Sequence, residues 1–106
     1  MPETYKSFGT ILGTTAATSI YSGVTGTAIV NSVYFSNVSS ANSAKVSLEV
    51  LKGSTAFSII TNGVVPIESS LQAIDAPIVL ETGNTLRATA GLTGIFHAFV
   101  SVLEIT

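Results

Sequence analysis

Apolar and polar residues alternate most regularly in residues 44–51, which read Ala-Lys-Val-Ser-Leu-Glu-Val-Leu. A period of two places the apolar side chains on one face of an extended chain and the polar side chains on the other. The sequence therefore predicts a β-strand here that lies on a core and turns its polar face to water.

Further strands are predicted from β-branched and apolar runs that end at Gly, Asn, Ser or Pro. They cover residues 17–21, 27–38, 56–61, 64–67, 69–74, 78–80, 85–90 and 95–105. Asn62-Gly63 predicts a hairpin turn because both residues tolerate positive φ. Pro66 would make the returning strand an edge strand, since proline cannot donate to a ladder.

Helix signals are missing, so the pattern predicts an all-β fold. We expect a single antiparallel β-sandwich, jelly-roll-like, with about eight strands. Residues 1–13 are expected to form a flexible or partner-ordered N-terminal arm, and residues 14–106 the β-sandwich domain.

The last predicted strand, residues 95–105, is apolar on both faces. Ile95 and Phe99 lie on one face, and Phe96 and Val100 lie on the other. Such a strand is central in a two-sided core or packs against another subunit. We therefore expect one of these two pairs to line a subunit interface.

Charged residues make up only 9% of the 106 residues, against about 25% in ordinary soluble domains. Two explanations remain open: a surface rich in Thr and Ser, or a surface largely buried against neighbours, whose interface cores are poor in charge. The second is favoured. The net charge of −2 and four Lys and Arg residues cannot supply a phosphate-binding patch, so nucleic-acid binding is not expected.

The candidate chemistry is sparse. His97 is the only histidine and lies within an apolar strand, which is more typical of a packed core or interface residue than of a catalytic base. Cysteine is absent and Asp75 is the only aspartate, so no metal site is expected. Asp75 and Glu81 are interpreted as turn residues, and the sequon at Asn37 as a strand end and turn. We predict no enzyme, no catalytic residues and no cofactor.

Neither a signal peptide nor an apolar run long enough for a membrane helix is visible, so we expect a soluble chain made in the cytoplasm, with no membrane partner. Carbohydrate binding remains an alternative, since small sandwiches often bind glycans through exposed aromatic residues. The candidates are Tyr5, Tyr21 and Tyr34; the chain has no Trp, and Tyr34 is expected in the core with Phe35.

Several strand-and-turn segments resemble small β-sandwich virion structural proteins of tailed bacteriophages, of the type found in cyanophages and marine phages. The similarity covers residues 14–105. Its segments are Ile20-Tyr21, Gly26-Thr27-Ala28, Val33-Tyr34-Phe35-Ser36-Asn37, the alternating strand 44–50, Ser69-Ser70-Leu71, the run from Ala76 to Leu86, and Ser101-Val102-Leu103-Glu104-Ile105.

The resemblance implies a virion protein present in many copies and made in the host cytoplasm. We expect a capsid decoration (cement) protein that stabilises the head and contacts the major capsid protein or other virion proteins. A homo-oligomer is expected, with a trimer favoured by capsid symmetry. A tail, collar or fibre-associated protein is the alternative within the same family of particles.

Overall fold

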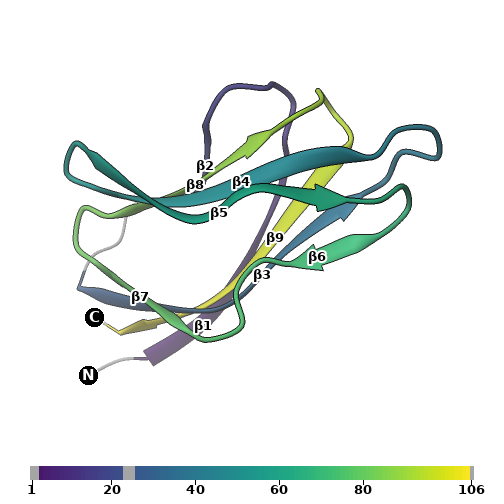
Figure 1. Cartoon of the computed structure of the whole chain (residues 1–106). Helices are drawn as coiled ribbons and strands as arrows, with labels where there is room; N and C mark the ends of the chain where they lie inside the picture. The colour runs from purple at the N-terminus through teal and green to yellow at the C-terminus, as the bar shows by residue number, and fades with distance from the viewer. Residues whose placement is uncertain (1–2, 23–25, 106) are drawn as a thin grey trace.

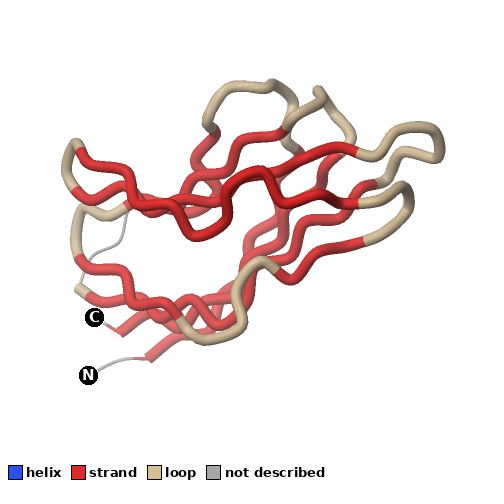
Figure 2. The backbone as a smooth tube through the Cα atoms, viewed as in Figure 1, coloured by secondary structure: helices blue, strands red, loops and turns tan. Residues whose placement is uncertain are grey.

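The computed structural model describes residues 3–22 and 26–105, which form strands and loops without a helix (Figure 2). Nine strands follow one another within these described residues. They are β1 (Glu3–Ile11), β2 (Thr18–Tyr21), β3 (Thr27–Asn37), β4 (Ala44–Lys52), β5 (Thr55–Val65), β6 (Ser70–Gln72), β7 (Ile78–Glu81), β8 (Thr85–Ala90) and β9 (Phe96–Ile105). The predicted all-β fold is therefore confirmed.

Two antiparallel sheets stack face to face (Figure 1). The first sheet has the order β1-β9-β3-β6, with β7 also paired to β3, and the second has the order β2-β8-β4-β5. The chain pairs like one long antiparallel hairpin whose successive strand pairs alternate between the two sheets. These pairs are β1–β9, β2–β8, β3–β6/β7 and β4–β5. This pairing is the jelly roll, as the sequence predicts.

The ninth strand arises because one edge strand is interrupted. Both β6 and β7 pair with β3, at opposite ends of it, and residues 73–77 separate them. Within the break, the Ala73 N–H still bonds the Val33 carbonyl at 2.7 Å. Pro77 has no N–H to donate, and edge strands are where sheets tolerate proline. The nine strands thus occupy the eight positions of the predicted sandwich.

Residues 3–11 lie in the sandwich instead of forming a separate arm, and residues 1 and 2 of the expected arm lie outside the described residues. Residues 3–11 pair with β9 along their whole length, from Glu3 opposite Ile105 to Ile11 opposite His97. The sandwich therefore begins well before the expected boundary at residue 14. The apolar residues Tyr5, Phe8 and Ile11 recur every three positions, so no strand period is visible until β9 supplies a partner.

Strand β5 also departs from the prediction. Residues 55–65 form one strand along β4, and no hairpin turns at Asn62-Gly63. Asn62 does adopt positive φ (52°), but the pairing of β4 with β5 shifts register twice nearby, so the extra residues are absorbed as β-bulges. The edge of β4 offers hydrogen bonds over its full length, which a hairpin at residue 62 would forgo.

The core lies between the sheets and consists of side chains at alternate strand positions. In β3, Ala28, Val30, Val33 and Phe35 are fully buried, and the change of spacing after Val30 marks a bulge. The strand predicted at 44–51 contributes Val46, Leu48 and Val50 to the core, as the alternation predicts. This sets which face of each strand is available to other molecules.

Candidate functional site

Strand β9 separates the four predicted interface residues. Phe96 and Val100 are fully buried in the core, so they cannot line a subunit contact in the folded chain. Ile95 precedes the strand and packs partly buried against the core. Phe99 points away from the core and is 48% exposed. Of the four candidates, Phe99 is the side chain that can contact a neighbour.

Phe99 belongs to the surface that we call the outer face: the side of the β1-β9-β3 sheet, with β6 and β7, that turns away from the core. Directly paired residues share a face, so the register gives its rows. One row across the sheet is apolar throughout and runs Tyr5, Leu103, Ile29, Val79. Tyr5 is 78% and Val79 is 58% exposed.

A second row places Phe99 between Gly9 and Tyr34. Tyr34 is 41% exposed, so the prediction that it lies in the core with Phe35 is wrong for Tyr34 and right for Phe35. The two aromatic side chains stand side by side on neighbouring strands. The outer face thus carries apolar side chains on four strands.

A polar row separates these two apolar rows. It consists of Ser7, Ser101 and Ser32, which pair across β1, β9 and β3. A shallow hollow of about 330 Å³ lies here, lined by Tyr5, Lys6, Ser7, Asn31, Ser101 and Val102. Hydroxyl and amide groups beside an exposed tyrosine can bind a polar ligand.

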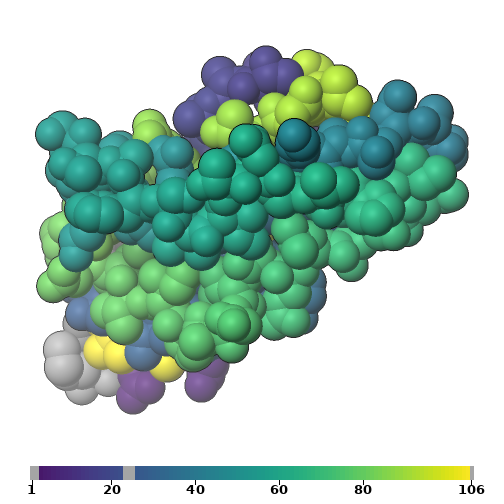
Figure 3. Space-filling view, in the orientation of Figure 1, coloured from purple at the N-terminus to yellow at the C-terminus, as the bar shows by residue number. Residues whose placement is uncertain are grey.

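The polar residues singled out in the sequence, His97, Asp75 and Glu81, lie at three separate places. His97 is exposed on the outer face between Ile11 and Ser36. Asp75 is exposed in the break between β6 and β7, where it lines a second, open hollow of about 500 Å³ with mainly apolar neighbours. That hollow lies between Ile59 of β5 and the β6–β7 segment. Both of these edge segments face the viewer in Figure 3.

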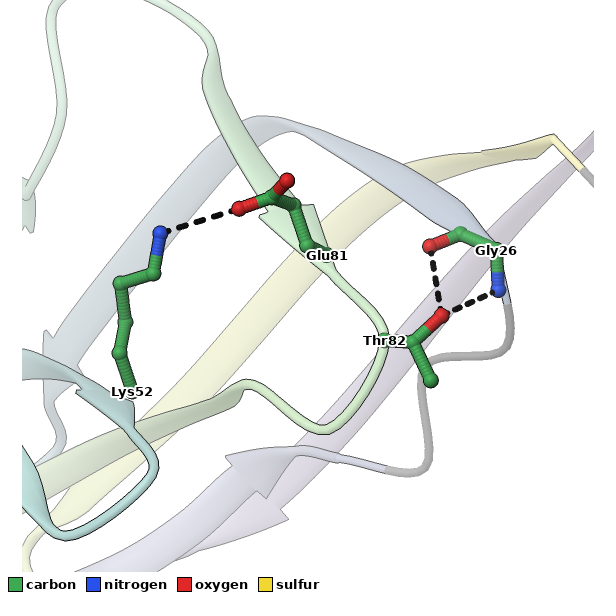
Figure 4. A network of polar contacts seen from close by, with 4 residues as sticks. All are labelled: Gly26, Lys52, Glu81 and Thr82. Atoms are coloured by element: carbon green, nitrogen blue, oxygen red, sulfur yellow. Dashed lines mark hydrogen bonds and ion pairs between the residues drawn. The ribbon is translucent and has the colours of Figure 1, made fainter.

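Glu81 ends β7 just before a turn, and its side chain makes an ion pair with Lys52 at 3.1 Å (Figure 4). The neighbouring Thr82 hydroxyl accepts a hydrogen bond from the Gly26 N–H at 2.9 Å and donates one to the Gly26 carbonyl at 3.1 Å. Both contacts hold the turn after β7 against adjacent strands, which is a structural role.

Asn37 forms a turn, as predicted. Its side chain is 2% exposed, its Nδ2 donates to the carbonyls of Asn42 and Val65, and its Oδ1 accepts from the Ser39 N–H. The amide that a glycan would modify is therefore buried and already bonded.

Tyr21, Lys6 and Glu104 form a polar cluster that joins β1 and β9 of the first sheet to β2 of the second sheet. The Tyr21 hydroxyl and the Lys6 ammonium bond the two oxygens of Glu104, at 2.5 and 3.0 Å. These bonds lower the pKa of the Glu104 carboxyl, and burial together with Glu104 raises the pKa of Tyr21 above its ordinary range. The cluster fastens β1 and β9 to β2 and removes Tyr21 from the glycan-binding candidates.

In the described ranges 3–22 and 26–105, no three His, Cys, Asp or Glu side chains come together as a metal site would require. The same residues contain no helix of the length and apolarity needed to span a membrane. Compared with known proteins, the chain matches no family model, no curated protein and no solved structure at a significant level.

Proposed function

We propose that this chain is a non-enzymatic structural subunit of a bacteriophage particle that binds neighbouring protein subunits through the outer face. Within the particle we propose the role of a capsid decoration protein, which stabilises the head by bridging subunits of the shell. The exposed apolar rows on the outer face carry this proposal.

Two features of the sequence support the same function. The charged fraction of 9% is low for a chain that keeps its whole surface in water. The resemblance to small phage virion proteins supplies the kind of particle, which the outer face alone does not specify.

Burial of apolar area would drive the binding. Each Å² of apolar surface removed from water contributes about 25 cal/mol, reduced by the costs of association and ordering. A contact limited to the outer face of one small sandwich would therefore be modest for each copy. Many copies on one shell would act together and make the covering stable.

The test compares two valines of nearly equal exposure on opposite sides of the molecule. Val79 lies on the outer face and is 58% exposed, and Val64 lies on β5 of the other sheet and is 60% exposed. Val79→Asp should reduce the number of copies in purified particles at least about tenfold, because it buries an unpaired carboxylate in the contact. Val64→Asp should leave the copy number unchanged.

Circular dichroism of both variants controls for folding. Equal incorporation of the two folded variants would contradict the role of the outer face. Absence of the wild-type chain from purified particles would contradict the proposed function itself. Immunogold labelling of wild-type particles distinguishes the head from the tail, collar or fibre position.

Carbohydrate binding is a second candidate, favoured by the hollow of about 330 Å³ beside Tyr5. An exposed aromatic ring next to Ser7, Asn31 and Ser101 offers stacking and hydrogen bonds to a sugar. A glycan array tests it: binding that Tyr5→Ala abolishes and Tyr34→Ala retains would support a site at this hollow, and an array without hits would exclude it for the glycans displayed.

A further inference from the structure

Each sheet has two edges, and three of the four carry features that hinder pairing with another chain. Strand β2 has only four residues and a register shift, β5 contains two register shifts, and the β6–β7 edge is interrupted at residues 73–77. Short strands, bulges and prolines are the usual protections of an edge. Strand β1 is the fourth edge; it runs for nine residues in unbroken register and contains no proline.

The direction of the β1 backbone groups follows from one hydrogen bond. The Leu12 N–H bonds the Phe96 carbonyl at 3.0 Å, so Leu12 directs its polar backbone groups toward β9. Since hydrogen-bonded and non-bonded positions alternate along an antiparallel pair, the even residues of β1 bond β9. The odd residues direct their N–H and C=O groups outward, and they are Glu3, Tyr5, Ser7, Gly9 and Ile11.

The side chains of these residues leave the edge accessible. All five are exposed, with Tyr5 at 78% and Ile11 at 62%. Lys6, the one cation of β1, is held on the other side of the strand by Glu104 at 3.0 Å. A lysine that would repel a second strand at this edge is therefore already paired within the chain.

We propose that β1 pairs antiparallel with β1 of a second copy of this chain, about a two-fold axis at Ser7. In this register Ser7 faces Ser7 of the second copy, Tyr5 faces Gly9, and Glu3 faces Ile11. All outward groups of both strands are then used: five donors from each copy give about ten hydrogen bonds.

The register also avoids unfavourable contacts. On the core-facing side Lys6 lies opposite Phe8 of the second copy, so no like charges face each other. The two sheets join into one continuous sheet, and the outer faces of the two copies become a single surface. This pairing goes beyond the proposed function, because it depends on the β1 edge and holds whether or not the chain assembles on a particle.

The first experiment measures the solution mass by light scattering from about 1 μM to about 1 mM chain. The pairing predicts a mass of twice 10.9 kDa at the upper end, in place of the trimer that capsid symmetry would favour. Ser7→Pro removes one outward N–H and should shift the dimer toward monomer at least about tenfold. Ser7→Ala keeps that N–H and should behave as wild type. A monomer throughout, a trimer, or a dimer insensitive to Ser7→Pro overturns the proposal.

A crosslinking experiment tests the register without depending on how Ser7→Pro folds. The chain has no cysteine, so a single introduced cysteine can only form a disulfide between chains. Two Cα atoms facing each other at position 7 would lie about 5.5 Å apart, within disulfide range. At position 5 they would lie more than about 13 Å apart. Mild oxidation should crosslink Ser7→Cys and not Tyr5→Cys; equal crosslinking of both, or of Tyr5→Cys alone, overturns the register.

Discussion

The hydroxyl of Tyr21 donates a hydrogen bond of 2.5 Å to the carboxylate of Glu104, 83 positions further along the chain. Tyr21 lies on β2 in one sheet and Glu104 on β9 in the other, so the bond joins the two sheets. It also holds the ring of Tyr21 near Phe8 of β1, with 5.2 Å between the ring centroids. The edge strand β1 is thereby attached to both sheets.

This relationship predicts an acid-dependent loss of stability. The hydrogen bond from Tyr21 and the contact with Lys6 lower the pKa of Glu104 in the folded chain from its ordinary value of 4.5. A lowered folded pKa stabilises the fold above the unfolded pKa, and this stabilisation is lost as the pH falls through the folded pKa.

Urea unfolding of the wild type and of Glu104→Gln at about pH 7 and about pH 3 measures this effect. The free energy of unfolding should fall more between these pH values for the wild type than for Glu104→Gln. Glu68→Gln, the same substitution at an exposed turn position, is the control for the loss of one carboxylate. Equal pH dependence of wild type and Glu104→Gln would refute the role of this carboxylate.

Two phenylalanines of β9 should differ sharply in their effect on stability. Phe96 is fully buried and Phe99 is 48% exposed, on opposite faces of one strand. Phe96→Ala should lower the free energy of unfolding by about 3–5 kcal/mol, because it leaves a cavity in the core. Phe99→Ala should cost about 1 kcal/mol or less. Chemical denaturation of both variants measures the difference, and similar losses would mean that the two faces are assigned incorrectly.

Gly91 should not tolerate a side chain. Its N–H bonds the Lys45 carbonyl at 2.7 Å, and a Cβ at this position would lie 3.0 Å from that same oxygen. Because the obstacle is backbone, Gly91→Ala should destabilise the fold by about 1–2 kcal/mol. Gly13 has no atom within 4 Å of its added Cβ, so Gly13→Ala should be neutral or stabilise by up to about 1 kcal/mol. The melting temperatures of the two variants should therefore move apart.

Asn37 should be more important for stability than its place in a turn suggests. Replacing it with Ala removes three hydrogen bonds and leaves the buried Val65 carbonyl without the Asn37 amide. We expect a loss of about 2–3 kcal/mol, since buried polar groups are costly to leave unpaired. Asn31→Ala, at an exposed position of the same strand, should cost less than about 0.5 kcal/mol. Denaturation curves that coincide for the two variants would show that the bonds of Asn37 contribute little.

The local pattern of the sequence was sufficient for the all-β class and for most strands. Alternation at residues 44–51 correctly indicated which side chains enter the core, because a strand directs successive side chains to opposite faces. The same pattern failed for β9, where both faces are apolar. Only the position of β9 between β1 and β3, beneath the second sheet, decided that Phe96 and Val100 are core and that Phe99 is exposed.

Tertiary pairing also decided what residues 3–11 and 55–65 form. Strand β1 has no period of two in its apolar residues, and it is extended because β9 offers a free edge. Asn62-Gly63 has the local chemistry of a hairpin turn, yet residues 55–65 pair with β4 as one bulged strand. The outer face follows from the same cause. Its rows combine residues such as Tyr5, Leu103 and Val79, whose proximity is fixed by the register between distant strands and leaves no local signal in the sequence.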